Sequence, residues 1–223
     1  MIKITGIKTF DLRFPTSDYL DGSDAMNPDP DYSAAYIILV TDAGLEGHGL
    51  TFTIGRGNEL CIYAFKALEP LILGLDLSWI THDMGRFWRH LTGDSQLRWV
   101  GPDKGILHLA TGAVVNAVWD LWGKYEKKPV WQLVYDMSPK EIVRLIDFRY
   151  LTDALKPEEA LEILENSSAD KKNRLSILMD EGYPCYNTSA GWLGYSDEKL
   201  YELCVKAKKS GFSHLKFKVG KED

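Results

Sequence analysis

Two lysines separated by one residue, Lys216 and Lys218, are the side chains whose type and spacing best suit catalysis. The run 214–219 around them predicts a strand, and because side chains alternate along a strand, both ammonium groups should lie on one face with Phe217 on the other. On the inner face of a barrel, partial burial and the neighbouring like charge favour the neutral amine of one lysine, which then acts as a general base. The competing interpretation is an exposed edge strand in which lysines prevent aggregation, and these three residues alone favour it.

A long polar loop, 15–32, is the second candidate for chemistry. Its segment Asp21-Gly22-Ser23-Asp24-Ala25-Met26 combines carboxylates, a hydroxyl and open backbone, which suit the binding of sugar hydroxyls. Loops of this length inside a compact domain are commonly mobile or functional. Gly, Ser and Asp are also the ordinary residues of solvated turns, so composition alone favours a turn over a binding loop.

Three predicted strands near the N-terminus frame this loop. Strand-forming residues indicate strands over 3–13, 34–41 and 47–53, and the Asp42-Ala43-Gly44 sequence marks a turn between the last two. Together they predict a three-stranded antiparallel sheet whose first connection is the polar loop.

Apolar residues at helical spacing begin after the third strand. A helix is predicted from Asn58, with Pro70 disrupting its continuation, and further helix around 79–91. The segment 104–124 is apolar almost all round, which predicts a buried helix at the centre of the domain.

The C-terminal part of the chain predicts connecting helices followed by one βαβ unit. The charged segment 139–183 indicates helices on the surface. A strand over 185–189, a helix over 196–210 and the strand that holds the two lysines then follow in the order of a βαβ unit. The boundary before this unit is predicted near Pro184.

Composition excludes several classes of protein. The 223 residues carry a formal net charge of -6, whereas general nucleic-acid binding needs clustered Lys and Arg. No apolar run reaches the roughly 18 residues that cross a bilayer. Cys61, Cys185 and Cys204 are widely spaced without a metal-site pattern, which indicates reduced thiols and a cytoplasmic protein.

Eight segments of the chain together carry a resemblance that none of them carries alone. They are 13–17, 21–26, 30–36, 96–102, 116–122, 146–150, 191–195 and 216–220. In these segments the sequence resembles the L-fuconate dehydratases of the enolase superfamily, within its mandelate-racemase-like branch.

The resemblance implies an α+β capping domain, made of an antiparallel three-stranded sheet plus helices, followed by the first βαβ portion of an incomplete (β/α)₈ TIM-type barrel. The implied boundaries are 1–137 for the capping domain, 138–183 for connecting helices and 184–223 for the start of a truncated barrel domain. A whole barrel takes about 250 residues, so only two of its strands are expected here.

The same resemblance implies roles for individual residues. Lys218 corresponds to the base that removes the proton next to the substrate carboxylate, and Lys216 to a cation that binds that carboxylate and stabilises the enediolate. The sugar-facing positions of the family correspond to Gly22, Ser23, Asp24 and Tyr32.

The implied activity is that of a lyase, the Mg²⁺-assisted dehydration of L-fuconate to 2-keto-3-deoxy-L-fuconate. The metal ligands and the histidine opposite the base are expected on later barrel strands, so no metal ligand is predicted in these 223 residues, and the chain alone is expected to be inactive and poorly stable. The expected partner is a small acid sugar, without nucleic acid or membrane, and the full-length form is expected to be a homo-oligomer. Two alternatives stay open, namely a dehydratase of another acid sugar such as rhamnonate or galactonate, and a non-catalytic capping-domain fragment or interaction protein.

Overall fold

The computed structural model describes residues 1–101 and 104–220, so Pro102 of the segment 96–102 and the final residues of the predicted barrel start lie outside the described residues. Contacts divide the chain into two compact units. The first unit consists of Met1–Leu12, Ala34–Phe52 and Gly57–Lys171. The second unit consists of Arg13–Ser33, Thr53–Arg56 and the chain from Lys172 onward. The sequence-based domain boundaries remain a prediction.

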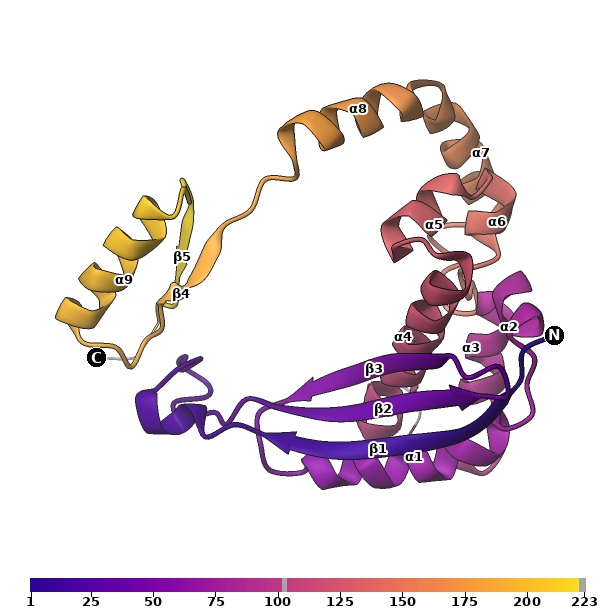
Figure 1. Cartoon of the computed structure of the whole chain (residues 1–223), viewed down its shortest axis with the longest axis horizontal. Coiled ribbons are helices and arrows are strands. Elements are labelled where there is room, and N and C mark those ends of the chain that lie inside the picture. Colours follow the sequence, from indigo (N-terminus) through magenta and orange to yellow (C-terminus); the bar gives the residue numbers. More distant parts are fainter. Residues whose placement is uncertain (102–103, 221–223) are drawn as a thin grey trace. The chain divides into compact units, whose positions relative to one another are not determined.

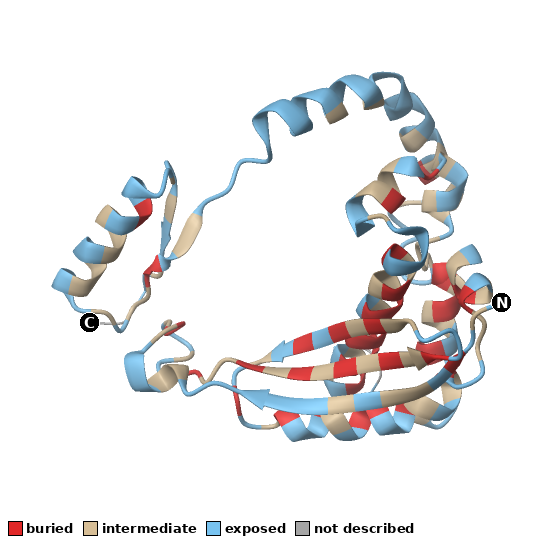
Figure 2. Cartoon of the chain, viewed as in Figure 1, coloured by how far each residue is buried: buried red, intermediate tan, exposed pale blue. Residues whose placement is uncertain are grey.

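The three predicted N-terminal strands are confirmed, each within one residue of its predicted ends. They are β1 (Ile4–Arg13), β2 (Ser33–Thr41) and β3 (Glu46–Thr53), in the spatial order β1-β2-β3 (Figure 1). Along β2 every second residue is buried, which Figure 2 shows as a regular alternation of colour. This period-two burial means that one face of the sheet meets the core.

The helices of the first unit follow the sheet in sequence. They are α1 (Asn58–Ile72), α2 (Leu77–His82), α3 (Met84–Thr92), the short η2 (Leu97–Val100), α4 (Ile106–Glu126), α5 (Val130–Asp136), α6 (Pro139–Val143) and α7 (Pro157–Ser167). The predicted buried helix corresponds to α4. No helix in the described ranges is long and apolar enough to span a bilayer.

The expected effect of Pro70 is wrong, because this proline lies inside α1 and the helix continues to Ile72. A proline within a helix removes one backbone hydrogen bond and is normally disruptive. Here Leu68 and Ile72 on either side of it are fully buried. Burial of two such side chains is worth about 1.5–3 kcal/mol each, which offsets the lost hydrogen bond.

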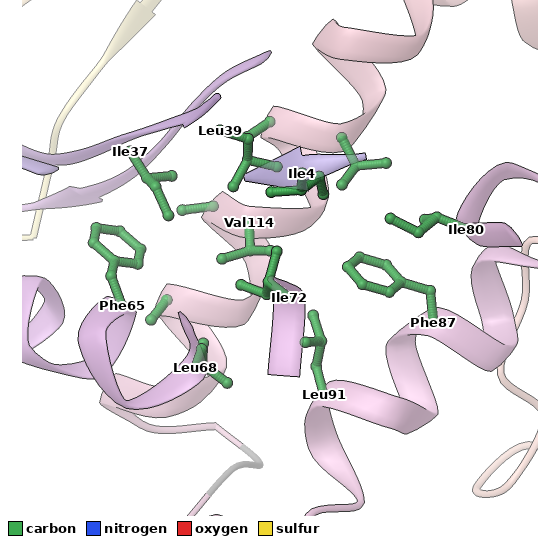
Figure 3. Packing of buried hydrophobic residues seen from close by; sticks show 14 of the residues in the cluster. Ile4, Ile37, Leu39, Phe65, Leu68, Ile72, Ile80, Phe87, Leu91 and Val114 are labelled. Carbon is green, nitrogen blue, oxygen red and sulfur yellow. The ribbon is translucent and has the colours of Figure 1, made fainter. Parts of the chain in front are cut away.

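The core of the first unit lies between the sheet and the helices α1 to α4 (Figure 3). Ile37 and Leu39 reach it from β2, Phe65 from α1, Phe87 from α3 and Val114 from α4, and all five are fully buried. The apolar pattern of the sequence therefore yields one continuous core in this unit.

Strand β3 approaches α4 through two glycines. A Cβ atom on Gly49 would lie 2.0 Å from the Ala113 carbonyl oxygen, and one on Gly47 would lie 2.3 Å from the Ala117 carbonyl oxygen. Real Cβ atoms essentially never come this close to backbone. The two glycines therefore permit a direct backbone contact between the sheet and its central helix.

The second unit contains the predicted βαβ arrangement. Strand β4 (Asn187–Gly191) pairs in parallel with β5 (Leu215–Phe217), and α9 (Asp197–Lys209) connects them. Strand β4 begins two residues later than predicted. The side chain of Ser196 caps α9 by accepting from the Lys199 backbone N–H, as expected for a serine at a helix start.

Two further helical segments belong to the second unit. The short η1 (Thr16–Tyr19) lies in the polar loop. The helix α8 (Lys171–Glu181), preceded by η3 (Ser168–Asp170), is almost wholly exposed (Figure 2). The barrel strands and the polar loop thus fall into the same compact unit.

Candidate functional site

The polar loop between β1 and β2 is closed at its neck by side-chain hydrogen bonds. The Thr16 hydroxyl donates to the Pro30 carbonyl at 2.8 Å and accepts from the Tyr32 backbone N–H at 2.8 Å. The Ser17 hydroxyl donates to Asp31 Oδ1 at 2.6 Å. This hydroxyl is the main reason that the pKa of Asp31 lies below its usual value. The loop therefore has a defined conformation that its own residues specify.

Gly22 is required by its backbone conformation and by the ring of Tyr32. Its φ of 86° lies in the left-handed region, which side-chain-bearing residues rarely adopt. A Cβ atom here would lie 2.2 Å from Tyr32 Cζ and 2.4 Å from the Tyr32 hydroxyl oxygen. Two of the predicted sugar-facing positions are therefore in direct van der Waals contact with each other.

Ser23 attaches the loop to the turn after β4. It is 2% exposed, its carbonyl accepts from the Leu193 N–H at 3.1 Å, and its hydroxyl oxygen accepts from the Gly194 N–H at 2.9 Å. A Cβ on Gly194 would lie 2.9 Å from the Ser23 hydroxyl oxygen and from Leu20. The structure thus places Ser23 in a buried contact that holds two distant segments together.

Asp21 forms a second attachment. Tyr195 donates its phenolic proton to Asp21 Oδ1. The Lys199 ammonium lies 3.4 Å from the same oxygen, donates to the Tyr19 carbonyl at 3.1 Å, and lies 3.7 Å from the centroid of the Tyr195 ring. Burial, with the bond to Asp21 and its charge, raises the pKa of Tyr195 well above the usual phenol value.

The raised pKa of Tyr195 gives a prediction for alkaline pH. Because the folded chain holds this proton more tightly than the unfolded chain, the contact stabilises the fold below the ordinary phenol pKa of 10.0, and this contribution is lost as the pH rises through the folded-state value. In an ultraviolet titration we expect Tyr195 to ionise last, after Tyr32, whose pKa is also raised. In Tyr195→Phe this late step should be absent, whereas Tyr201→Phe, which removes an exposed tyrosine of α9, should retain it. If the last ionisation step of Tyr195→Phe occurs at the same pH as in the wild type, the assignment is contradicted.

Asp24 of the polar loop forms an ion pair with Lys218, which follows β5. The carboxylate oxygen Oδ2 of Asp24 lies 3.5 Å from Lys218 Nζ. The other oxygen, Oδ1, accepts from the backbone N–H groups of Met26 and Asn27 at 2.9 and 2.8 Å. The pKa of Asp24 is lowered, chiefly by the backbone hydrogen bond from Asn27, with a smaller contribution from the charge of Lys218. An anionic carboxylate of the loop thus faces one of the two candidate lysines.

The indole ring of Trp192 lies beside this ion pair. Lys218 Nζ is 5.7 Å from its centroid, a distance typical of a cation–π contact. Tyr32 meets the same indole edge-to-face, with ring centroids 6.3 Å apart. Burial, followed by the charges of Asp24 and Asp21, raises the pKa of Tyr32.

Of the predicted site residues, five are brought together in the second unit, namely Gly22, Ser23, Asp24, Tyr32 and Lys218. Lys216 is exposed on β5. Next to this group lies a hollow of about 220 Å³ lined by Leu20, Ser23, Asp24, Ala25, Pro28, Leu193 and Gly194. Sequence reasoning did not single out Trp192, Tyr195 or Lys199 as parts of the site. Trp192 and Tyr195 could have been found from their position in the segment 191–195, which contributes to the family resemblance.

The described residues do not form a metal site. Within 1–101 and 104–220, no group of three or more His, Cys, Asp or Glu side chains is arranged to hold a metal ion. The groups gathered beside the loop are the ammonium of Lys218, the carboxylate of Asp24 and the rings of Tyr32 and Trp192.

Comparison with known proteins identifies relatives over nearly the whole chain. Residues 29–134 match the family described as mandelate racemase / muconate lactonizing enzyme, N-terminal domain. The chain is 53% identical to the L-galactonate dehydratase of Hypocrea jecorina, over 98% of this chain and 49% of that protein. It is 52% identical to human mitochondrial enolase superfamily member 1, whose crystal structure it matches with a TM-score of 0.94 over 99% of this chain and 50% of that one.

A more distant structural relative has the same fold. The L-talarate/galactarate dehydratase of Salmonella typhimurium LT2, liganded with Mg and L-lyxarohydroxamate, matches with a TM-score of 0.68 at 17% identity, over 100% of this chain and 45% of that one. The chain thus spans about half the length of the curated relatives it matches. The predicted fold, an α+β capping domain followed by the start of a barrel, is confirmed. Its close identity to these relatives and the family match over 29–134 show that the chain belongs to the enolase superfamily, with a mandelate racemase / muconate lactonizing enzyme N-terminal domain.

Proposed function

We propose that this chain supplies the substrate loop and the base lysine of an acid-sugar dehydratase that acts on L-fuconate. The observation that carries the proposal is the position of Lys218, whose ammonium lies 3.5 Å from Asp24 of a loop that is fastened to the barrel start. A base next to a polar, structured loop is what proton removal from a hydroxylated acid requires.

The proposed chemistry begins at the carbon next to the substrate carboxylate. The neutral amine of Lys218 takes the proton from this carbon, and the electron pair of the broken C–H bond moves toward the carboxylate. Lys216 is proposed to bind that carboxylate and to stabilise the negative charge that develops there. Loss of hydroxide from the next carbon, protonated as it leaves, yields water and an enol, which tautomerises to the 2-keto-3-deoxy acid.

Mg²⁺ enters the proposal as an expectation for the complete enzyme. Its support is the name of the Salmonella dehydratase, which is liganded with Mg. The described residues of this chain do not provide the acidic cluster that such an ion needs, so the steps above are assigned only to the lysines.

L-galactonate is the second candidate substrate, because a protein named L-galactonate dehydratase is 53% identical to this chain. L-fuconate is 6-deoxy-L-galactonate, so the two acids share every stereocentre and differ by one hydroxyl at C6. A pocket built around a methyl group rejects an added hydroxyl by only about 100-fold. We therefore expect turnover of both acids, with L-fuconate preferred.

A panel of acid sugars tests the proposal. L-Fuconate, L-galactonate and L-rhamnonate are incubated with Mg²⁺ and either the 223-residue chain or the polypeptide that its gene encodes, and keto-acid formation is measured. L-Rhamnonate keeps the C6 methyl group and changes the hydroxyl stereochemistry, so it separates recognition of the methyl group from recognition of the hydroxyls. Turnover of L-galactonate alone would transfer the assignment to that acid, and turnover of none of the three would favour the non-catalytic alternative.

The location that fits this proposal is the cytoplasm. Cys61 is buried, Cys204 is half-buried and Cys185 is exposed, all as free thiols. Burial, with a smaller effect of Glu59, raises the pKa of the Cys61 thiol and keeps it protonated at neutral pH. A fluorescent fusion of the polypeptide observed in its native cell tests this part of the proposal.

A further inference from the structure

Asp24 divides its two carboxylate oxygens between two tasks. Its Oδ1 is engaged inside the loop, where it accepts from the Met26 N–H at 2.9 Å, the Asn27 N–H at 2.8 Å and the Asn27 side-chain amide at 3.2 Å. Its Oδ2 points across the junction to Lys218. Because three donors fix Oδ1, the loop itself determines where Oδ2 lies.

Lys218 is positioned from both ends. Its backbone N–H donates to the Gly191 carbonyl at 2.7 Å, which continues the pairing of β5 with β4. Its ammonium lies 3.5 Å from Asp24 Oδ2 and 5.7 Å from the centroid of the Trp192 ring, and its side chain is 28% exposed. Water can therefore reach this lysine while the carboxylate holds it.

Other ionisable groups lie farther from the pair of Asp24 and Lys218. Lys216 lies two residues earlier, on β5, and Tyr32 contacts the Trp192 ring edge-to-face. Asp21 is engaged by Tyr195 and Lys199. Among the described groups, Asp24 is the carboxylate that lies within ion-pair distance of Lys218.

We propose that Asp24 is a positioning residue that favours the ammonium form of Lys218 until a substrate hydroxyl occupies Oδ2. This inference rests on the proposed role of Lys218 as the base. An ammonium ion cannot accept a proton, so the ion pair lowers the reactivity of the base in the free enzyme. A sugar hydroxyl that donates to Oδ2 weakens the pair, Lys218 releases its proton to bulk water, and the amine then takes the proton from the substrate. Recognition by the loop and readiness of the base are thereby coupled.

Competitive labelling of the 223-residue chain tests the pairing without any need for turnover. The chain is treated with a small amount of acetic anhydride at fixed pH, and acetylation of Lys218 relative to Lys216 is measured by fragmentation mass spectrometry of the peptide that contains both. In Asp24→Asn the side-chain carbonyl can still accept the loop hydrogen bonds of Oδ1, but the charge facing Lys218 is gone. We expect the ratio of Lys218 to Lys216 labelling to rise about two- to fivefold, the range that a partly exposed ion pair accounts for.

Asp29→Asn is the matched control, because it makes the same chemical change at an exposed position of the same loop. It should leave the labelling ratio unchanged. An unchanged ratio in Asp24→Asn, or an equal rise in both variants, would overturn the proposal.

A pH profile separates this inference from the proposed function. If the encoded polypeptide turns over an acid sugar, Asp24→Asn should move the acid limb of its kcat/KM profile to lower pH, since less alkali is then needed to free the base. If the polypeptide turns over no acid sugar, the proposed function is wrong. The labelling ratio would still show whether Asp24 changes the reactivity of Lys218. If the labelling ratio changes but the acid limb of the kcat/KM profile does not move, Asp24 is not coupled to catalysis.

Discussion

Replacement of Lys218 by alanine should abolish exchange of the substrate α-proton with solvent in the active polypeptide. The physical reason is that the methyl group of alanine cannot accept a proton. General base catalysis is typically worth about 10²–10⁴-fold, and we expect a loss of dehydration rate within or above this range. Exchange is measured by NMR of the acid sugar in deuterated buffer, which detects proton removal even when loss of water is slow.

Two further variants show that the loss is specific to the amine. Lys218→Arg retains a cation next to Asp24 and Trp192 but offers no base, because guanidinium does not lose its proton near neutral pH, and it should be as inactive as the alanine variant. Lys209→Ala removes an exposed lysine at the end of α9 and should leave exchange intact. Retained exchange in Lys218→Ala would disprove the assignment of the base.

Replacement of Gly49 by alanine should destabilise the first unit. The added Cβ would lie 2.0 Å from the Ala113 carbonyl oxygen and 2.7 Å from the Ala117 backbone nitrogen. Neither atom can rotate away, since both belong to the backbone of α4, so strand and helix must separate. Overpacking of this kind costs about 1–3 kcal/mol, and backbone contact places Gly49→Ala at the upper end of that range. Urea unfolding followed by circular dichroism measures the loss on the chain as it stands.

Gly6→Ala is the matched control for that measurement. Gly6 lies on β1 of the same sheet, and a Cβ there would have no atom within 4 Å. We expect its unfolding midpoint to equal or exceed that of the wild type, because alanine restricts the unfolded chain more than glycine does. Equal stability of the Gly49→Ala and Gly6→Ala variants would mean that β3 and α4 do not pack as described.

The sheet could be predicted from sequence because its pattern is local. Along β2 the alternation of buried and half-buried residues follows the alternation of side chains that the sequence already displays. The end of α1 could not be predicted in the same way. Pro70 is a strong local signal for helix termination, but tertiary burial of Leu68 and Ile72 outweighs it, and burial is not visible in a window of a few residues.

The candidate site likewise has features that contiguous sequence predicts and contacts that it does not predict. The alternation of Lys216 and Lys218 and the unusual length of the polar loop are properties of contiguous sequence, so both can be read without a structure. The bonds of Ser23 to Gly194 and of Asp21 to Tyr195 join residues more than 170 positions apart. No local sequence pattern reports such pairs, because the contacts of Trp192 and Tyr195 with the loop arise only in the tertiary structure.

The attachment of the loop to the turn after β4 determines which segments would have to be exchanged together if the loop sets substrate preference as proposed. Ser23 and Asp21 bind partners in 191–199, and Gly194 leaves just enough room for Leu20 and Ser23. If the loop alone were grafted into another protein, it would lack the partners that Ser23 and Asp21 bind here. The loop and residues 191–199 would therefore have to be exchanged together.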